Sequence, residues 1–369
     1  MRLLTFIIIA FIFAGCNSTN PKSDSIVYPF YLGTYTYGPS EGIYSYSLLS
    51  DGSIDSLGLA AITENPSFII KDLNNKYLLA TNEVASNGTG FIESFLISGD
   101  GLIHQNRTET GGAHPCHIDI DNEGMVLVSN YSGGNVGLFN LDKIGVLSDL
   151  LYLDKHTGYG TTPRQKGPHA HSAYFLPNTN QIISADLGTN ELWLTKLDST
   201  KTSFLIDETI KLPMEKGAGP RHICFNPRGN WLYVINELNS SITQVEYNQN
   251  GEIKIVGNTS TLPDGFRGSN DCADIHITND GNFLYASNRG HNSIAIFKVM
   301  PTTGELVSSG HVSTHGNWPR NFALTPDDKF LVVANRRSNN ITSFKRNKET
   351  GSLQYLNQIN APEPVCILF

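Results

Sequence analysis

An internal repeat constrains this chain more than any other feature. Six times, a small or polar residue leads into an apolar strand, a tight turn of Asn, Asp or Gly follows, and a second apolar strand ends in Asn or Asp. One copy reads GPRHICFNPRGNWLYVINE. The second strands of the six copies end on Asn82, Asn130, Asp186, Asn236, Asn288 and Asn335. Their spacing of about fifty residues is typical of solenoids, propellers and arrays.

Each copy continues into two further strands. After the Asn or Asp, segments such as SSITQVEYN and NNITSFKRN alternate polar and apolar residues, and a turn containing Gly leads into segments such as GEIKIVGNT and GSLQYLNQI. Alternation with a period of two predicts β-strands, and no segment has the periodicity of a helix. Four antiparallel strands in each repeat are typical of a propeller blade.

The two ends of the chain complete a seventh blade. FYLGTYT and EGIYSYSLL read as a second and a third strand without a first, and the C-terminal EPVCILF reads as a first strand alone. We therefore predict an all-β fold, a seven-bladed β-propeller of four-stranded antiparallel blades, in one domain over residues 26–369. Joining N- and C-terminal strands in one blade closes the ring and leaves no open edge between blades.

The N-terminal residues resemble a bacterial lipoprotein signal. Residues 1–15 contain an early Arg, a short apolar run and small residues directly before Cys16, so we expect a signal peptide there. Residues 16–25 would then be the lipidated cysteine and a polar tether. This predicts an exported bacterial lipoprotein, anchored to a membrane on the periplasmic side or at the outer membrane. An ordinary signal peptide with an unrelated cysteine is the alternative.

Cysteine placement and charge exclude several classes of protein. Cys116, Cys224, Cys272 and Cys366 lie in apolar strands of different repeats, which favours buried free thiols over disulfides. None belongs to a Cys-x-x-Cys pair, so zinc ribbons and redox dithiols are excluded. The formal net charge of -8 argues against nucleic acid as a partner,. Clustered Arg and His in such a chain favour an anionic small molecule.

Propeller topology predicts where the functional residues gather. The first strand of a blade begins, and the second strand ends, at the same face of the ring. Residues at these two places therefore meet around the mouth of the central channel. Arg221 and Glu237 occupy these two places in one repeat, so we expect them to be neighbours in space.

The other repeats carry varied polar residues at the same two places. Structural repetition does not require such variation, which favours a ligand site; ion pairs between blades are the alternative. The candidate substrate-binding residues are His117, His169, His222, Asp274, His276, Arg289 and Arg320. Glu83, Tyr131 and Arg336 follow the recurrent Asn in three copies. The recurrent Asn itself is expected to cap a turn through side chain–backbone hydrogen bonds.

Four long motifs stand out in the repeats: GPHAHS at 167–172, GAGPRHICFNPRGNWLYVINELNSSI at 217–242, ADIHITNDGNFLYASNRGHNSIAIF at 273–297 and PRNFALTPDDKFLVVANRRSNNI at 319–341. They resemble the lactonase family of seven-bladed propellers, which includes bacterial 6-phosphogluconolactonase and fungal carboxymuconate cyclase. The resemblance covers nearly all of the mature chain. It implies that His171, Arg221 and Glu237 are catalytic, with Arg289 or Arg320 as a further cation.

The resemblance implies a 6-phosphogluconolactonase-like hydrolase of a sugar lactone. Arg221 and Arg320 would hold the anionic group and polarise the carbonyl, and Glu237 or His171 would take a proton from water. A carboxymuconate cyclase-like lactonising enzyme, or a non-catalytic binding propeller on a membrane, are the alternatives. A metal-dependent lactonase ranks below these because Arg side chains in the ring would repel a cation. We expect no cofactor, no bound metal and a monomer.

Overall fold

The structure, a computed structural model, describes residues 27–99, 101–248 and 252–369. The predicted signal peptide (1–15) and the predicted lipidated cysteine with its tether (16–25) lie outside these residues. Among the residues that are described, the only helical element is the 3-10 turn η1 (Arg336–Ser338). No helix in this part of the chain has the length and hydropathy needed to cross a membrane.

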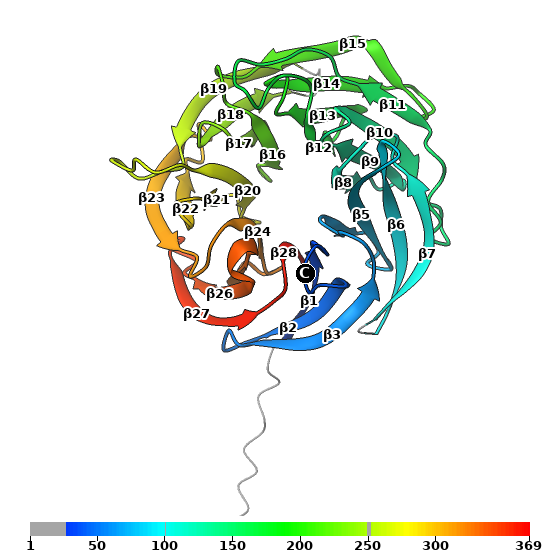
Figure 1. Cartoon of the computed structure of the whole chain (residues 1–369). Coiled ribbons are helices and arrows are strands. Elements are labelled where there is room, and N and C mark those ends of the chain that lie inside the picture. The colour runs from blue at the N-terminus through cyan, green and yellow to red at the C-terminus, as the bar shows by residue number, and fades with distance from the viewer. Residues whose placement is uncertain (1–26, 100, 249–251) are drawn as a thin grey trace, which may run out of the picture.

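Seven four-stranded antiparallel sheets are arranged in a ring, which confirms the predicted propeller (Figure 1). The first complete blades are β4 (Ile69–Lys71), β5 (Tyr77–Ser86), β6 (Thr89–Ser98), β7 (Gly101–Glu109); β8 (Pro115–Ile120), β9 (Met125–Asn130), β10 (Asn135–Asn140), β11 (Tyr152–Lys155); and β12 (Ala170–Phe175), β13 (Gln181–Asp186), β14 (Glu191–Leu197), β15 (Phe204–Pro213). The next three are β16 (Pro220–Phe225), β17 (Trp231–Asn236), β18 (Ser241–Tyr247), β19 (Ile253–Ser260); β20 (Asp271–Ile277), β21 (Phe283–Arg289), β22 (Ser293–Val299), β23 (Leu306–Ser313); and β24 (Pro319–Leu324), β25 (Phe330–Asn335), β26 (Asn340–Arg346), β27 (Leu353–Asn360).

The seventh blade joins the two ends of the chain, as the sequence predicts. It consists of β28 (Pro364–Leu368), β1 (Val27–Thr34), β2 (Gly42–Leu49) and β3 (Ile54–Ile62), in that order from the channel outwards. We call it the closing blade. In Figure 1 the red β28 lies beside the blue β1 near the centre of the ring. Pairing the two termini in one sheet makes closure of the ring depend on a contact between residues far apart in sequence.

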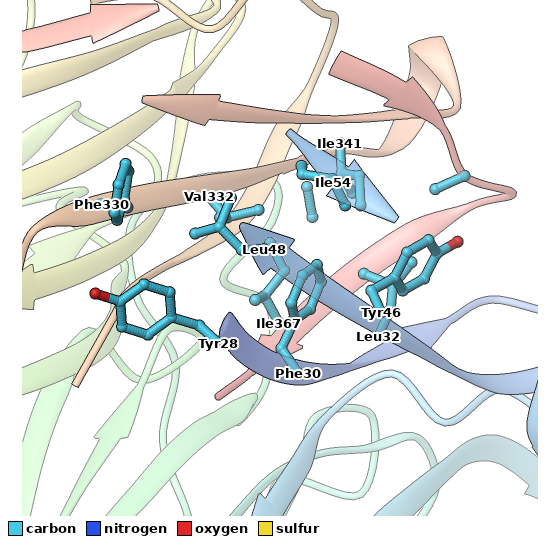
Figure 2. Packing of buried hydrophobic residues seen from close by; sticks show 12 residues of the cluster. Tyr28, Phe30, Leu32, Tyr46, Leu48, Ile54, Phe330, Val332, Ile341 and Ile367 are labelled. Carbon is cyan, nitrogen blue, oxygen red and sulfur yellow. The ribbon is translucent and has the colours of Figure 1, made fainter. Parts of the chain in front are cut away.

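Apolar residues pack between neighbouring blades. Figure 2 shows one such cluster, in which Phe30 and Leu48 of the closing blade meet Val332 of β25. Phe30 is 1% exposed, and both Leu48 and Val332 are fully buried. Burying a side chain of this size stabilises the fold by roughly 1.5–3 kcal/mol. The alternating apolar residues of the repeat therefore hold each blade against the next. All four described cysteines are free thiols, as predicted.

Five of the seven inner strands share a β-bulge close to their first residue. In β16, Pro220 pairs with Asn236 and His222 with Ile235, so Arg221 has no partner in β17. The same one-residue shift leaves the second residue of four other inner strands unpaired: Cys116, His171, Arg320 and Val365. A bulge redirects the side chain of its extra residue. The fold thus offers one specially placed side chain in each of these blades at the channel mouth.

The recurrent Asn at the end of the second strand binds the connection that leads into its blade. Nδ2 of Asn130 donates to the carbonyl of Thr110, Asn288 to that of Thr261 and Asn335 to that of Thr314. Each of these Thr residues directly follows the outermost strand of the preceding blade. The Asn is therefore structural, as predicted, but its bond to the backbone links neighbouring blades rather than capping its own turn. Within its own blade it donates to a side chain, as Asn130 does to Asn135 and Asn288 to Ser293.

Candidate functional site

A polar cavity opens at the mouth of the channel where the bulged residues lie. It has a volume of about 170 Å³, similar to an engineered cavity of about 150 Å³ that binds benzene, so it suits a small molecule,. Its walls are made of Tyr35, Glu83, Cys116, Tyr131, Arg164, His171, Glu237, Arg289 and Arg320. We call it the mouth pocket.

Two repeated positions and one connection supply these residues. Cys116, His171 and Arg320 are bulged second residues of inner strands. Five others lie at or near the end of the second strand of their blades: Tyr35, Tyr131 and Glu237 directly follow it, Arg289 ends it, and Glu83 lies within β5 directly after Asn82. Because these positions recur around the ring, side chains from all seven blades converge on one cavity.

Arg164 comes from residues 156–169, the longest connection between blades. The buried Gln165 holds this connection in place: its Oε1 accepts hydrogen bonds from the amides of Thr161 and Thr162, and its Nε2 donates to the carbonyl of Leu187. The Arg164 side chain is 46% exposed and reaches across the mouth from this anchor. A connection held by its own buried amide thus adds a cation that the repeat does not provide.

Glu237 is the centre of the charges. Its Oε2 lies 3.1 Å from Nε of Arg221 and 2.8 Å from Nη2 of Arg289, and its Oε1 lies 2.6 Å from Nη2 of Arg164. Burial raises the pKa of this carboxyl, but Arg289, Arg221 and Arg164 together outweigh burial and lower the pKa to about 2. Glu237 is therefore ionised at physiological pH and anchors three guanidinium groups. The predicted proximity of Arg221 and Glu237 is confirmed.

Arg320 is the cation whose donors stay available. Among the described residues it makes no hydrogen bond; its Nη2 lies 3.7 Å from Oε2 of Glu83, and its guanidinium lies 5.3 Å from the ring centre of Tyr35. Burial opposes its charge, but Tyr35 and Glu83 outweigh burial and raise its pKa. A charged guanidinium without bound acceptors is suited to hold a carboxylate, a phosphate or a developing oxyanion.

His171 presents a neutral imidazole in the same pocket. Its Nδ1 lies 3.8 Å from Sγ of Cys116, whose thiol also contacts the His171 carbonyl oxygen at 3.3 Å. Nε2 has no hydrogen-bond partner in the described part of the chain. Burial, followed by the charge of Arg221 and by His222, holds the pKa of His171 well below its ordinary value. The unprotonated ring can accept a proton from a bound molecule.

Several predicted site residues lie outside the walls of the mouth pocket. Arg221 is only 2% exposed and lies behind Glu237. His117, His222, Asp274 and His276 are further along the inner strands. His169 stacks on Tyr131, with 4.5 Å between ring centres, at the rim. Of the ten predicted catalytic and binding residues, the structure brings four together in the pocket walls: His171, Glu237, Arg289 and Arg320.

Sequence reasoning missed Arg164, Cys116 and Tyr35. Cys116 reads as a core thiol because it lies in an apolar strand, and Tyr35 reads as part of an incomplete repeat. Arg164 lies outside the repeat, and the unusual length of its connection was the only signal for it. Within the described ranges, no three His, Cys, Asp or Glu side chains are arranged to hold a metal ion.

A larger groove elsewhere is a weaker candidate. It lies along the turns that contain Asp72, Asp121 and Asp142. Each of these carboxylates accepts hydrogen bonds from backbone amides of its own turn, for example Asp121 from Met125 and Asp142 from Val146. These acids are therefore occupied by local structure.

Comparison with known proteins agrees with the fold and with the resemblance. Residues 29–369 match the family described as Lactonase, 7-bladed beta-propeller. A protein of Bacillus subtilis strain 168 named 6-phosphogluconolactonase is 38% identical over 346 residues, which cover 92% of this chain and 97% of that protein. The structure of a Pseudomonas aeruginosa periplasmic gluconolactonase superposes with a TM-score of 0.88 at 27% identity, covering 93% of this chain and 98% of that one. A Lactobacillus plantarum protein gives a TM-score of 0.86 at 30% identity, covering 93% and 99%. The chain therefore belongs to the lactonase family of seven-bladed β-propellers.

Proposed function

We propose that this protein hydrolyses a sugar lactone at the mouth pocket, as a 6-phosphogluconolactonase-like enzyme. One observation carries the proposal: the charged Arg320, whose donors are unoccupied, shares a small cavity with the neutral His171. The pocket walls contain three guanidinium groups, Arg164, Arg289 and Arg320, and two carboxylates, Glu83 and Glu237. This balance suits a substrate with an anionic group or a developing negative charge.

The reaction needs a base for water and a donor for the oxyanion. Water attacks the lactone carbonyl carbon and gives its proton to Nε2 of His171, while Arg320 stabilises the negative charge that forms on the carbonyl oxygen. The carbon–oxygen bond of the ring then breaks. The protonated His171 returns its proton to the leaving alkoxide, which yields the open hydroxy acid.

Geometry favours His171 over Glu237 as the base, because guanidinium groups bind both oxygens of Glu237 whereas Nε2 of His171 has no hydrogen-bond partner among the described residues. Glu237 has a pKa of about 2 because of its arginine partners, so its affinity for a proton is low. Burial and Arg221 lower the pKa of His171 most, and Arg320 adds to them; an anionic substrate next to Arg320 would partly neutralise this smaller contribution and thereby strengthen the base,. In this mechanism Glu237 fixes Arg164 and Arg289 in the pocket walls.

The named relatives suggest the substrate class. The Bacillus subtilis relative is called a 6-phosphogluconolactonase, and the Pseudomonas aeruginosa relative a periplasmic gluconolactonase. We therefore propose an aldonolactone, with or without a 6-phosphate, as the substrate. Proton release from gluconolactone and from its 6-phosphate by the purified protein measures turnover of each.

Arg320→Ala tests the mechanism. We expect kcat/KM to fall by about 100-fold or more, as for loss of one oxyanion donor, and Arg320→Lys to recover part of the loss. Arg337→Ala is the matched control, because Arg337 is an exposed arginine near the mouth that stacks on Trp318 at 3.4 Å and does not line the pocket. Equal activity in Arg320→Ala and the control would refute the proposal.

We also propose that the protein is exported and anchored through Cys16. The residues before Cys16 support this, as does the periplasmic location stated for the Pseudomonas aeruginosa relative. In a bacterial host, Cys16→Ala should release the protein from the membrane fraction and abolish incorporation of a radiolabelled fatty acid. Membrane association that survives this substitution would contradict a lipid anchor.

A further inference from the structure

Beneath the mouth pocket, buried polar side chains connect neighbouring inner strands. Arg221 and His222 come from β16 and Asp274 from β20, and they are 2%, 5% and 3% exposed. None of the three lines the pocket. Burying a guanidinium and a carboxylate costs free energy, which apolar residues of similar size would avoid. A function that needs these groups would explain their presence.

Arg221 connects this layer to the pocket. Its Nε donates to Oε2 of Glu237 at 3.1 Å, and its Nη1 donates to the carbonyl of Ala273 at 2.5 Å. The same Nη1 lies 3.1 Å from Nε2 and 3.3 Å from Nδ1 of His222. One end of the guanidinium therefore touches the carboxylate in the pocket wall, and the other end rests against an imidazole.

Asp274 determines the state of that imidazole. Its Oδ1 lies 2.8 Å from Nδ1 of His222, and a carboxylate can only accept, so Nδ1 carries the proton,. Burial, followed by the charge of Arg221, lowers the pKa of His222 to about 4. His222 is thus neutral at pH 7, and its Nε2 presents a lone pair towards Arg221.

The second carboxylate oxygen of Asp274 also has hydrogen-bond partners. Oδ2 lies 2.9 Å from Nε2 of His276 and accepts a hydrogen bond from Nδ2 of Asn321 at 2.5 Å. Burial raises the pKa of Asp274, but His276 and His222 outweigh burial and keep the pKa well below its ordinary value. Asp274 is therefore an anion in a fixed position, bound by His222 of β16 on one side and by Asn321 of β24 on the other.

We propose that Asp274 and His222 are positioning residues for the reaction in the mouth pocket. Asp274 orients His222, His222 supports Arg221, and Arg221 fixes the carboxylate of Glu237, which holds the pocket arginines. The effect on turnover rests on the function proposed above. The chain of contacts itself does not depend on it.

Asp274→Asn is the first test, because it removes the charge and keeps the shape. We expect kcat to fall by about 100-fold, the size of effect caused by small misplacements of catalytic groups, with little change in KM since Arg320 and His171 remain. Tyr174→Phe is the matched control: it removes a half-buried hydroxyl that lies next to His117 and accepts a hydrogen bond from the Ile223 amide, with no bond to the Arg221 side chain. The control should keep the wild-type kcat.

Two substitutions of His222 separate positioning from folding. Gln offers both a donor amide and an acceptor oxygen, so His222→Gln should keep more of the kcat than His222→Ala, with both variants checked for a cooperative unfolding transition. If Asp274→Asn fails to fold, this pair still decides. Equal kcat in the two His222 variants, or a wild-type kcat in Asp274→Asn, would overturn the proposal.

A spectroscopic measurement keeps this test separate from the proposed activity. In protein labelled with ¹⁵N-histidine, His222 should give the signals of a neutral ring protonated on Nδ1 at pH 7, assigned by their loss in His222→Gln. In Asp274→Asn these signals should shift. If the wild type hydrolyses no lactone but shows this tautomer, the proposed function fails and the positioning contacts stand. A protonated or Nε2–H ring would overturn the positioning role.

Discussion

The β16–β19 blade and the closing blade have the same backbone at the channel mouth and different side chains. In both, the second residue of the inner strand is bulged: Arg221 in one and Val365 in the other. In both, the residue after the second strand lines the mouth pocket: Glu237 in one and Tyr35 in the other. The comparison separates what builds the ring, which is shared, from what gives it chemistry, which is not.

Removing the charge of Glu237 should make the β16–β19 blade resemble the closing blade. Glu237→Gln leaves Arg221, Arg289 and Arg164 without their common carboxylate. We expect kcat/KM to fall by about 1,000-fold and the free energy of unfolding to fall by roughly 3–5 kcal/mol, the usual cost of breaking a buried ion pair. Lactone assays and chemical denaturation measure the two effects.

A matched control for Glu237→Gln is Glu246→Gln. Glu246 is an exposed residue of β18 in the same blade, outside the mouth pocket. It should leave both quantities unchanged. If activity survived Glu237→Gln, the β16–β19 blade would contribute no more to the chemistry than the closing blade does.

At the end of the second strand, a substitution should affect stability and leave the chemistry intact. The β12–β15 blade has Asp186 where five other blades have Asn, and His156 where four of those five have Thr. Nδ1 of His156 lies 2.7 Å from Oδ2 of Asp186, and both side chains are fully buried. His156→Ala should lower the free energy of unfolding by about 3–5 kcal/mol. The double variant His156→Thr with Asp186→Asn should lose less, because it restores the Thr–Asn pair of other blades.

Thermal unfolding of His156→Thr, Asp186→Asn and the double variant tests this link between blades. A coupling energy near zero in the double-mutant cycle would mean that the two residues act separately. A loss of kcat in fully folded His156→Ala would mean that the end of the second strand contributes to chemistry as well as to the ring.

The fold could be predicted because the same strand and turn pattern occurs six times in the sequence. Alternation, turns and spacing agree in six copies, and the two leftover ends fit only a closing blade. The bulges could not be predicted, because one unpaired residue in a strand does not disturb the composition or the turns. Arg221 and Val365 occupy the same bulge with opposite polarity, so residue type gave no signal either.

The sequence predicted which strand ends contribute residues to the site, but not how near to the pocket each side chain lies. Topology brings Glu237, Arg289 and Arg320 to one mouth, and the structure confirms this. It does not say which of two consecutive residues, such as Arg221 and His222, lies nearer the pocket, because a bulge changes the direction of both. Arg164 could not be predicted because it belongs to a connection that has no counterpart in the other repeats.

Acid should reduce the stability that the β16–β19 blade contributes through Glu237, and should leave the contribution of the closing blade unchanged. The pKa of Glu237 is about 2 in the folded protein and 4.5 ordinarily, so its stabilising effect is complete above pH 4.5 and is lost as the pH falls towards 2. At about 1.4 kcal/mol per pKa unit, this is worth roughly 3 kcal/mol. Denaturation between pH 5 and 2 should show a smaller decline in Glu237→Gln than in the wild type, and parallel curves would contradict the lowered pKa.

The smallest effect should come from the closing blade. The hydroxyl of Tyr35 donates to Oε2 of Glu83 at 2.7 Å, and Glu83 is the carboxylate 3.7 Å from Arg320. Tyr35→Phe should cost about 1 kcal/mol of stability and raise KM a few-fold, because Glu83 loses a donor and draws Arg320 away from the substrate. Tyr37→Phe is the control, since Tyr37 is 69% exposed and stacks on Tyr35. If Tyr35→Phe reduced kcat as strongly as Glu237→Gln, the two blades would be equal parts of the catalytic machinery, and the distinction between them would fail.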